Sequence, residues 1–77
     1  MNKARRKWFQ NVINVLEDQK CELEDIMEEE QEFIDNAPEN LACSERYETA
    51  EEIVDELNDA ISDLEDIISN LNETVEK

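Results

Sequence analysis

The most regular pattern of apolar positions in this chain lies between Tyr47 and Val75. Apolar or aromatic residues fill every a and d position of one heptad frame: Tyr47, Ala50, Val54, Leu57, Ile61, Leu64, Ile68, Leu71 and Val75. Such a run predicts a helix whose seam packs against another helix. The g positions Ile53, Ala60, Ile67 and Thr74 widen the stripe beyond what a two-helix seam needs. This width favours a bundle of three or four helices.

A second, less regular stripe precedes it. The frame places Phe9, Ile13, Leu16, Leu23, Met27 and Ile34 at a and d, and Val12, Ile26 and Phe33 at g. Lys20 interrupts this stripe at an a position, where its stem can lie on the core with the ammonium group in water, or where it can fix the helix register. Glu30 falls at d, either as an exposed rim residue or as a hydrogen-bond partner of Tyr47 or Arg46.

One break separates the two stripes. Pro38 cannot continue a helix and disfavours helical backbone at Ala37. We therefore predict a single domain over residues 1–77, with a helix over about 3–35, a turn over 36–43 and a helix over about 44–76. Ser44 is the expected N-cap of the second helix. A short helical turn starting at Pro38 would let Leu41 close the open end of the hairpin.

These elements predict an all-α fold, an antiparallel two-helix hairpin with coiled-coil-like heptads. Because the connection is short, the helices should be antiparallel neighbours. A lone hairpin would leave one apolar strip exposed to water: Val12, Ile26, Phe33, Ile53 and Ile67. Exposed strips of this kind usually mark an interface, so we expect a homodimer that forms a four-helix bundle.

Composition excludes most enzyme classes. The chain of 77 residues has no histidine and no glycine, so the commonest general base and all Gly-rich phosphate loops are missing. The sequence therefore predicts no catalytic residue, no cofactor, no small-molecule substrate and no enzyme activity. We also expect no metal site, since an EF-hand loop needs a glycine and the di-iron bundle motif needs histidine.

Two cysteines and the absence of a signal peptide indicate a reducing compartment, and we expect a cytoplasmic protein. Cys21 lies within the first predicted helix and Cys43 in the turn, about 20 Å apart or more at 1.5 Å per residue. A disulfide within one chain cannot span that distance. No apolar run approaches the length of a membrane span.

The net charge of −16 is unevenly distributed. From Trp8 onward, three basic residues accompany all 23 acidic ones. The second helix carries an outward acidic face: Asp55, Glu56, Asp59, Asp63 and Asp66. Roughly one carboxylate per 2 Å of bundle approaches the charge density of duplex DNA, about one per 1.7 Å. The face can be a solvated surface, or a nucleic-acid-like surface that binds a basic host protein.

Four basic residues of the first turns form an arm together with the aromatic residue that follows them: Lys3, Arg5, Arg6, Lys7 and Trp8. We call this segment the basic arm. In an antiparallel hairpin it returns beside Glu65, Asp66, Glu73 and Glu76, where it could neutralise the acidic C-terminal end. It could also contact nucleic acid or a membrane surface, with Trp8 as an aromatic anchor. The acidic remainder of the chain would repel both polyanions. Trp8 lies at a c position of the heptad, outside the main stripe. It could contact a partner, or it could belong to a second packing face across the dimer.

Four short motifs carry a resemblance: Arg5-Arg-Lys near the start, Glu29-Glu-Gln-Glu, Pro38-Glu-Asn-Leu and Ser44-Glu-Arg-Tyr-Glu. With these, the chain resembles a set of small, uncharacterised acidic helical proteins of Gram-positive bacteria, their phages and mobile elements. The resemblance implies a small cytoplasmic protein, where inhibition of host machinery is a common task. Three hypotheses follow: a protein-binding inhibitor that uses the acidic face, a purely structural oligomerisation bundle, and a nucleic-acid or membrane contact through the arm.

Overall fold

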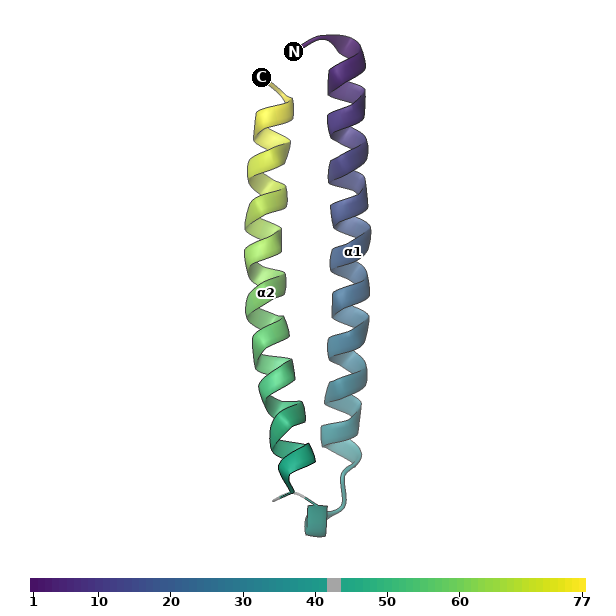
Figure 1. Cartoon of the computed structure of the whole chain (residues 1–77), viewed down its shortest axis with the longest axis vertical. Coiled ribbons are helices and arrows are strands. Elements are labelled where there is room, and N and C mark those ends of the chain that lie inside the picture. Colours follow the sequence, from purple (N-terminus) through teal and green to yellow (C-terminus); the bar gives the residue numbers. More distant parts are fainter. Residues whose placement is uncertain (42–43) are drawn as a thin grey trace.

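The chain folds into two long antiparallel helices. The computed structural model describes residues 1–41 and 44–77, with α1 at Lys3–Asn36, the short 3-10 helix η1 at Glu39–Leu41 and α2 at Glu45–Val75. Figure 1 shows α1 and α2 side by side along their length, with both termini at one end and η1 at the other. Within the described residues there is no strand. The all-α helical hairpin predicted from the heptads is therefore confirmed.

Side-chain caps define where each helix begins. The Ser44 hydroxyl oxygen accepts a hydrogen bond from the backbone N–H of Tyr47 at 3.2 Å, which confirms Ser44 as the N-cap of α2. At the start of α1, the Asn2 side-chain oxygen accepts one from the backbone N–H of Arg5 at 2.8 Å. Asn2 is therefore the N-cap of α1.

Pro38 ends α1 as its chemistry requires. Ala37 takes an extended conformation, with φ −68° and ψ 132°, because the proline ring clashes with helical backbone in the preceding residue. The short helical turn is present, but it begins at Glu39 and not at Pro38. The expected closure of the hairpin by the Leu41 side chain, and the position of Cys43, lie outside what the structure describes.

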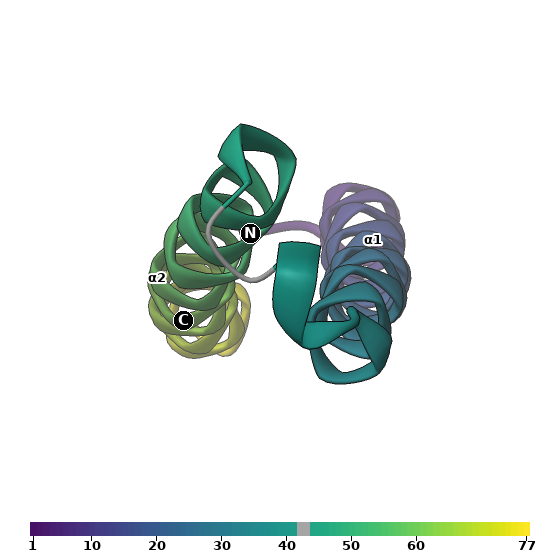
Figure 2. The same ribbon diagram turned by 90° about the horizontal axis from the view of Figure 1, so that it is seen from below.

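The hydrophobic core is a single narrow seam. Its buried residues are Ile13, Ala50, Ile61, Ile68 and Val75. All of them occupy a or d positions of the heptad frame. The molecule extends 60 × 15 × 14 Å, and Figure 2 shows the two helices as separate stacks viewed end-on. Because the rod is only two helices wide, the residues that flank the seam stay in contact with solvent.

Candidate functional site

One flank of the seam carries the apolar side, which we define as Val12, Ile26, Phe33, Ile53 and Ile67. In an antiparallel pair, the g positions of both helices turn toward the same flank. Val12 remains 47% exposed, and Ile26 and Ile67 are each 50% exposed. Phe33 and Ile53 are half-buried. The structure thus leaves these side chains partly in water.

The two ends of the apolar side differ. At the turn end, Phe33 and Ile53 line a shallow hollow together with Arg46. At the terminal end, Val12 lines an apolar hollow with Arg5 and Trp8. Trp8 is 70% exposed, and the neighbouring Val15 is 57% exposed. Large apolar surface therefore continues from the apolar side onto the outer flank of α1.

The opposite flank carries the polar side, which we define as Glu17, Glu24, Gln31, Asn58, Glu65 and Asn72. These are e positions of the two helices, and they line two shallow grooves. Lys20 bridges the helices here: its Nζ donates a hydrogen bond to Glu65 Oε1 at 3.3 Å and lies 3.6 Å from Glu24 Oε1. The ion pair joins α1 to α2 across the seam.

This geometry supports both interpretations of Lys20. Its side chain is 24% exposed, so the stem lies against the seam while the ammonium group reaches the surface. The ammonium group also contacts the other helix, as expected of a residue that fixes register. The hydrogen bond that Lys20 donates to Glu65 raises the pKa of Lys20, with smaller contributions from the charges of Glu65 and Glu24, whereas desolvation lowers it.

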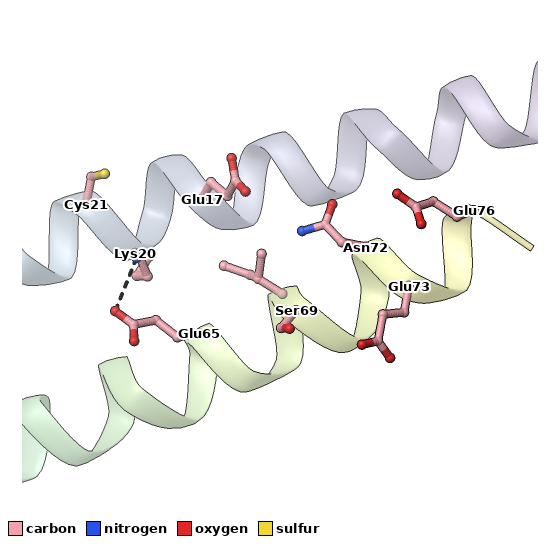
Figure 3. Close-up of a pocket in the computed structure, with 9 residues that line it drawn as sticks. Glu17, Lys20, Cys21, Glu65, Ser69, Asn72, Glu73 and Glu76 are labelled. Carbon is pink, nitrogen blue, oxygen red and sulfur yellow. Dashed lines mark hydrogen bonds and ion pairs between the residues drawn. The ribbon is translucent and has the colours of Figure 1, made fainter.

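Figure 3 shows one of the polar grooves in detail. Lys20 and Glu65 point toward each other between the helices, and Asn72 extends from α2 toward α1. Cys21 and Glu73 point away from the gap between the helices. Polar groups on this flank can therefore contact water or one another, which distinguishes it from the apolar side.

The predicted acidic face lies on the outer surface of α2. Asp55, Glu56, Asp59, Asp63 and Asp66 are all exposed. Within residues 1–41 and 44–77, every ion pair shorter than 4 Å involves Lys20. The carboxylates of the acidic face are thus free of salt bridges in the described part of the chain, and they present uncompensated negative charge.

The basic arm occupies the first turns of α1, and all of its residues are exposed. The expected neutralisation of the C-terminal acids is not observed, since the described residues contain no ion pair between the arm and Glu65, Asp66, Glu73 or Glu76. The hairpin register explains this. Phe9 packs against the core cluster that contains Val75, the last residue of α2. Lys3, Arg6 and Lys7 therefore lie at or beyond the level where α2 ends, whereas Arg5 and Trp8 line the terminal hollow together with Leu71 of α2.

The structure also corrects the expected contacts of Glu30. In the described residues Glu30 is half-buried and makes no hydrogen bond with Tyr47 or Arg46. The Arg46 guanidinium instead lies over the Phe33 ring, 4.9 Å from its centroid. Arg46 is a g residue of α2 and Phe33 is a g residue of α1, so both lie on the same flank. Their pairing could be predicted only with the register of the two helices as well.

The described residues contain neither a cluster of metal-ligating side chains nor a helix able to cross a membrane. No three cysteine or carboxylate side chains of residues 1–41 and 44–77 lie close enough together to hold a metal ion. Neither α1 nor α2 has a segment with the length and hydropathy required to cross a bilayer. The surfaces that remain for function are the apolar side, the acidic face and the basic arm.

Comparison of the chain with protein-family models, with curated proteins and with solved structures finds no match. The similarity to small acidic phage and bacterial proteins stays a prediction from the four sequence motifs. Any function must therefore be argued from the surfaces themselves.

Proposed function

We propose that this chain is a non-enzymatic protein-binding module with two working surfaces. Two hairpins join through their apolar sides into a four-helix bundle. The acidic face of each α2 then stays outside the bundle, where it binds a basic protein. The observation that carries the proposal is the row of partly exposed aliphatic side chains along one flank of the seam.

Dimerisation follows from the hydrophobic effect. Val12, Ile26 and Ile67 are each about half exposed on one flank. Burying the exposed half of such a side chain contributes roughly 1 kcal/mol, and a two-fold dimer buries five from each copy. This gain has to exceed the cost of association, which is several kcal/mol or more. Heptads with apolar a, d and g positions are the pattern that four-helix bundles use.

The acidic face supports binding to a basic protein. Its five carboxylates are exposed and unpaired among the described residues, so a partner would not have to break existing salt bridges. Like the phosphates of duplex DNA, they form a dense row of negative charge along a rod. A nucleic-acid-binding protein is the kind of partner that such a row attracts. The resemblance to phage and mobile-element proteins suggests a host protein as the target and inhibition as the result.

A purely structural homo-oligomer is the second candidate, and the same apolar side favours it. The two candidates differ only in whether the acidic face has a partner. They are separated by testing each surface with its own variants.

Sedimentation equilibrium tests the apolar side. We expect the wild-type chain to be a dimer at micromolar concentration, and Ile26→Glu or Ile67→Glu to be monomeric because each places a charge inside the interface. Ser62→Glu is the matched control: it adds the same charge to exposed helical surface on the other flank of α2 and should leave the dimer intact. A wild-type chain that stays monomeric would refute the assembly.

Affinity capture from a nuclease-treated bacterial lysate tests the acidic face. The expected result is one basic, nucleic-acid-handling protein, released as salt rises and displaced by duplex DNA. The variant D55N/D59N/D63N/D66N should lose it. The control E22Q/D25N/E29Q/E32Q removes the same charge from exposed positions of α1 and should retain it. Equal capture by both variants would leave only the structural candidate.

A further inference from the structure

We infer that the two copies associate in opposite directions, so that the basic arm of each hairpin lies against the acidic turn end of the other. This inference rests on the proposed assembly and adds the arrangement of its partner, a second copy of this chain. It also gives the arm a role that the single hairpin does not provide.

Four of the five residues of the apolar side lie symmetrically about its centre, and the fifth, Ile26, has Gln19 as its counterpart. On α1, Val12 and Phe33 lie at equal distances on either side of the point between Gln19 and Ile26. On α2, Ile53 and Ile67 lie at equal distances from Ala60. A two-fold axis perpendicular to the rod maps each of these sets onto itself.

The hairpin register places both centres at nearly the same height. Lys20 pairs with Glu65, and Phe33 pairs with Arg46. Interpolating between these two contacts places the point between Gln19 and Ile26 close to the level of Ile61, within about 2 Å of Ala60 along the rod at 1.5 Å per residue. One axis therefore serves both helices: it brings Val12 of one copy to Phe33 of the other, and Ile53 to Ile67. Ala60 lies near the axis, where its small side chain permits close approach.

Hydrophobic contacts alone also allow a parallel arrangement, with an axis along the rod. Charge decides between the two. The arm carries Lys3, Arg5, Arg6 and Lys7, all exposed and none in an ion pair within the described residues. A parallel dimer would place the two arms together at one end, and like charges in proximity oppose association.

The turn end has the complementary charge. Arg46 is the only basic residue between positions 28 and 48, and it is surrounded by exposed carboxylates: Glu28, Glu29, Glu32, Asp35, Glu39, Glu45 and Glu48. The perpendicular axis carries Arg5 of one copy about 6 Å beyond Asn36, the last residue of α1 of the other, toward η1 and Glu39. Because the basic residues of the arm make no ion pair within their own hairpin among the described residues, they are free to make these contacts.

Distance measurement between spin labels tests the direction. In a Cys21→Ser/Cys43→Ser background, a label at Asn11→Cys lies on the outer surface of α1. In the antiparallel dimer the two labels are separated by about 35 Å along the rod, at 1.5 Å per residue. In the parallel dimer they are level. A label at Asp25→Cys is also on the outer surface of α1 but lies close to the axis, and it is the control: its two copies are separated along the rod by only about 8 Å in the antiparallel dimer and are level in the parallel one.

Charge reversal supplies a second, independent readout. Reversing the arm (K3E/R5E/R6E/K7E) should weaken the dimer by about tenfold or more, because several exposed pairs of about 0.2–1 kcal/mol each become repulsive. Glutamates at a helix N-terminus favour the macrodipole, so α1 itself should not unfold. Adding E32K/D35K/E39K/E45K to the reversed arm should restore the affinity, which a parallel dimer would not do.

The outcomes separate the two proposals. A monomeric wild-type chain refutes the assembly and this inference together. A dimer in which the distances at positions 11 and 25 are equal, or whose affinity is unchanged by arm reversal, refutes the antiparallel arrangement alone. Binding of the wild-type arm to duplex DNA or to anionic vesicles, lost on reversal while the dimer is unaffected, would assign the arm to that partner and also overturn the inference.

Discussion

The two flanks of the seam differ in the contacts that their side chains make within a single hairpin. On the polar side, Lys20 and Glu65 join the helices, and Glu17, Gln31 and Asn58 are exposed to water. On the apolar side, Val12, Ile26 and Ile67 are about half exposed. The Phe33 ring is covered by the Arg46 guanidinium. The same two helices thus place polar groups on one flank and leave apolar side chains exposed to water on the other.

This difference shows that a heptad pattern contains two kinds of information. The a and d residues determine that two helices pair, and they form a buried seam in the hairpin. The g and e residues determine what each flank can do next, because they lie at the border of the seam. Apolar g residues favour further association, whereas charged e residues oppose it on their own flank.

The largest expected effect concerns the seam that both flanks share. Ile13 is fully buried, and Ile13→Ala leaves a cavity in the core cluster. We expect the free energy of unfolding to fall by about 2–5 kcal/mol, as for other buried aliphatic truncations. Chemical denaturation monitored by circular dichroism measures it. Val15→Ala, at a side chain that is 57% exposed, is the control and should change stability by less than about 0.5 kcal/mol. Equal losses would mean that α1 does not bury the face described.

A double substitution should abolish the contrast between the flanks. Glu24→Ile with Glu65→Ile replaces two carboxylates of the polar side by aliphatic groups and gives the hairpin a second apolar flank. We expect assemblies larger than a dimer, because each hairpin could then be covered on both sides. Light scattering coupled to size exclusion measures the mass. Glu24→Gln with Glu65→Gln removes the same charges without adding apolar surface, and it should stay dimeric. If the isoleucine variant has the mass of the glutamine variant, flank polarity does not control assembly.

Local features of this fold could be predicted from the sequence, whereas contacts between the two helices could not. The seam residues, the Ser44 cap and the extended Ala37 follow from local rules of periodicity, capping and proline sterics, so they could be predicted without knowing the register. The contacts of Lys20, Arg46 and the arm could not, because each requires the relative height of the two helices. Of the two interpretations of Glu30, the hydrogen bond to Arg46 or Tyr47 is not observed in the described residues, and Arg46 lies over Phe33 instead. The described residues likewise contain no ion pair between the arm and the C-terminal acids.

A smaller effect should distinguish the Lys20 ion pair from the rest of the polar side. The pKa of Lys20 is raised in the folded chain, chiefly by its hydrogen bond to Glu65. The pair therefore stabilises the fold below the ordinary lysine pKa of about 10.4, and this contribution is lost as pH rises through the higher folded value. Between pH 8 and pH 11.5, wild type should lose more stability than Lys20→Met, as measured by urea unfolding.

Lys20→Arg is the matched variant for this comparison. Its guanidinium keeps its charge throughout that pH range, so the alkaline loss at this position should disappear while an ion pair to Glu65 remains available. The other titrating groups are common to all three chains and cancel in the differences. Identical pH profiles for wild type and Lys20→Met would show that the bridge between the helices contributes nothing.

The smallest effect concerns Phe33, whose ring is covered by the Arg46 side chain of the same hairpin. Arg46→Met removes the guanidinium from the Phe33 ring but keeps an unbranched apolar stem. An exposed cation–π contact contributes about 0.5–1 kcal/mol, so the unfolding free energy should fall by roughly that amount at a fixed protein concentration below the dimer dissociation constant. The exposed Phe33 ring then adds to the apolar side, and the dimer should become equal in affinity or tighter. Denaturation and sedimentation equilibrium measure the two quantities separately. A weaker dimer would instead assign Arg46 to the interface, where it would contact the second copy near Trp8.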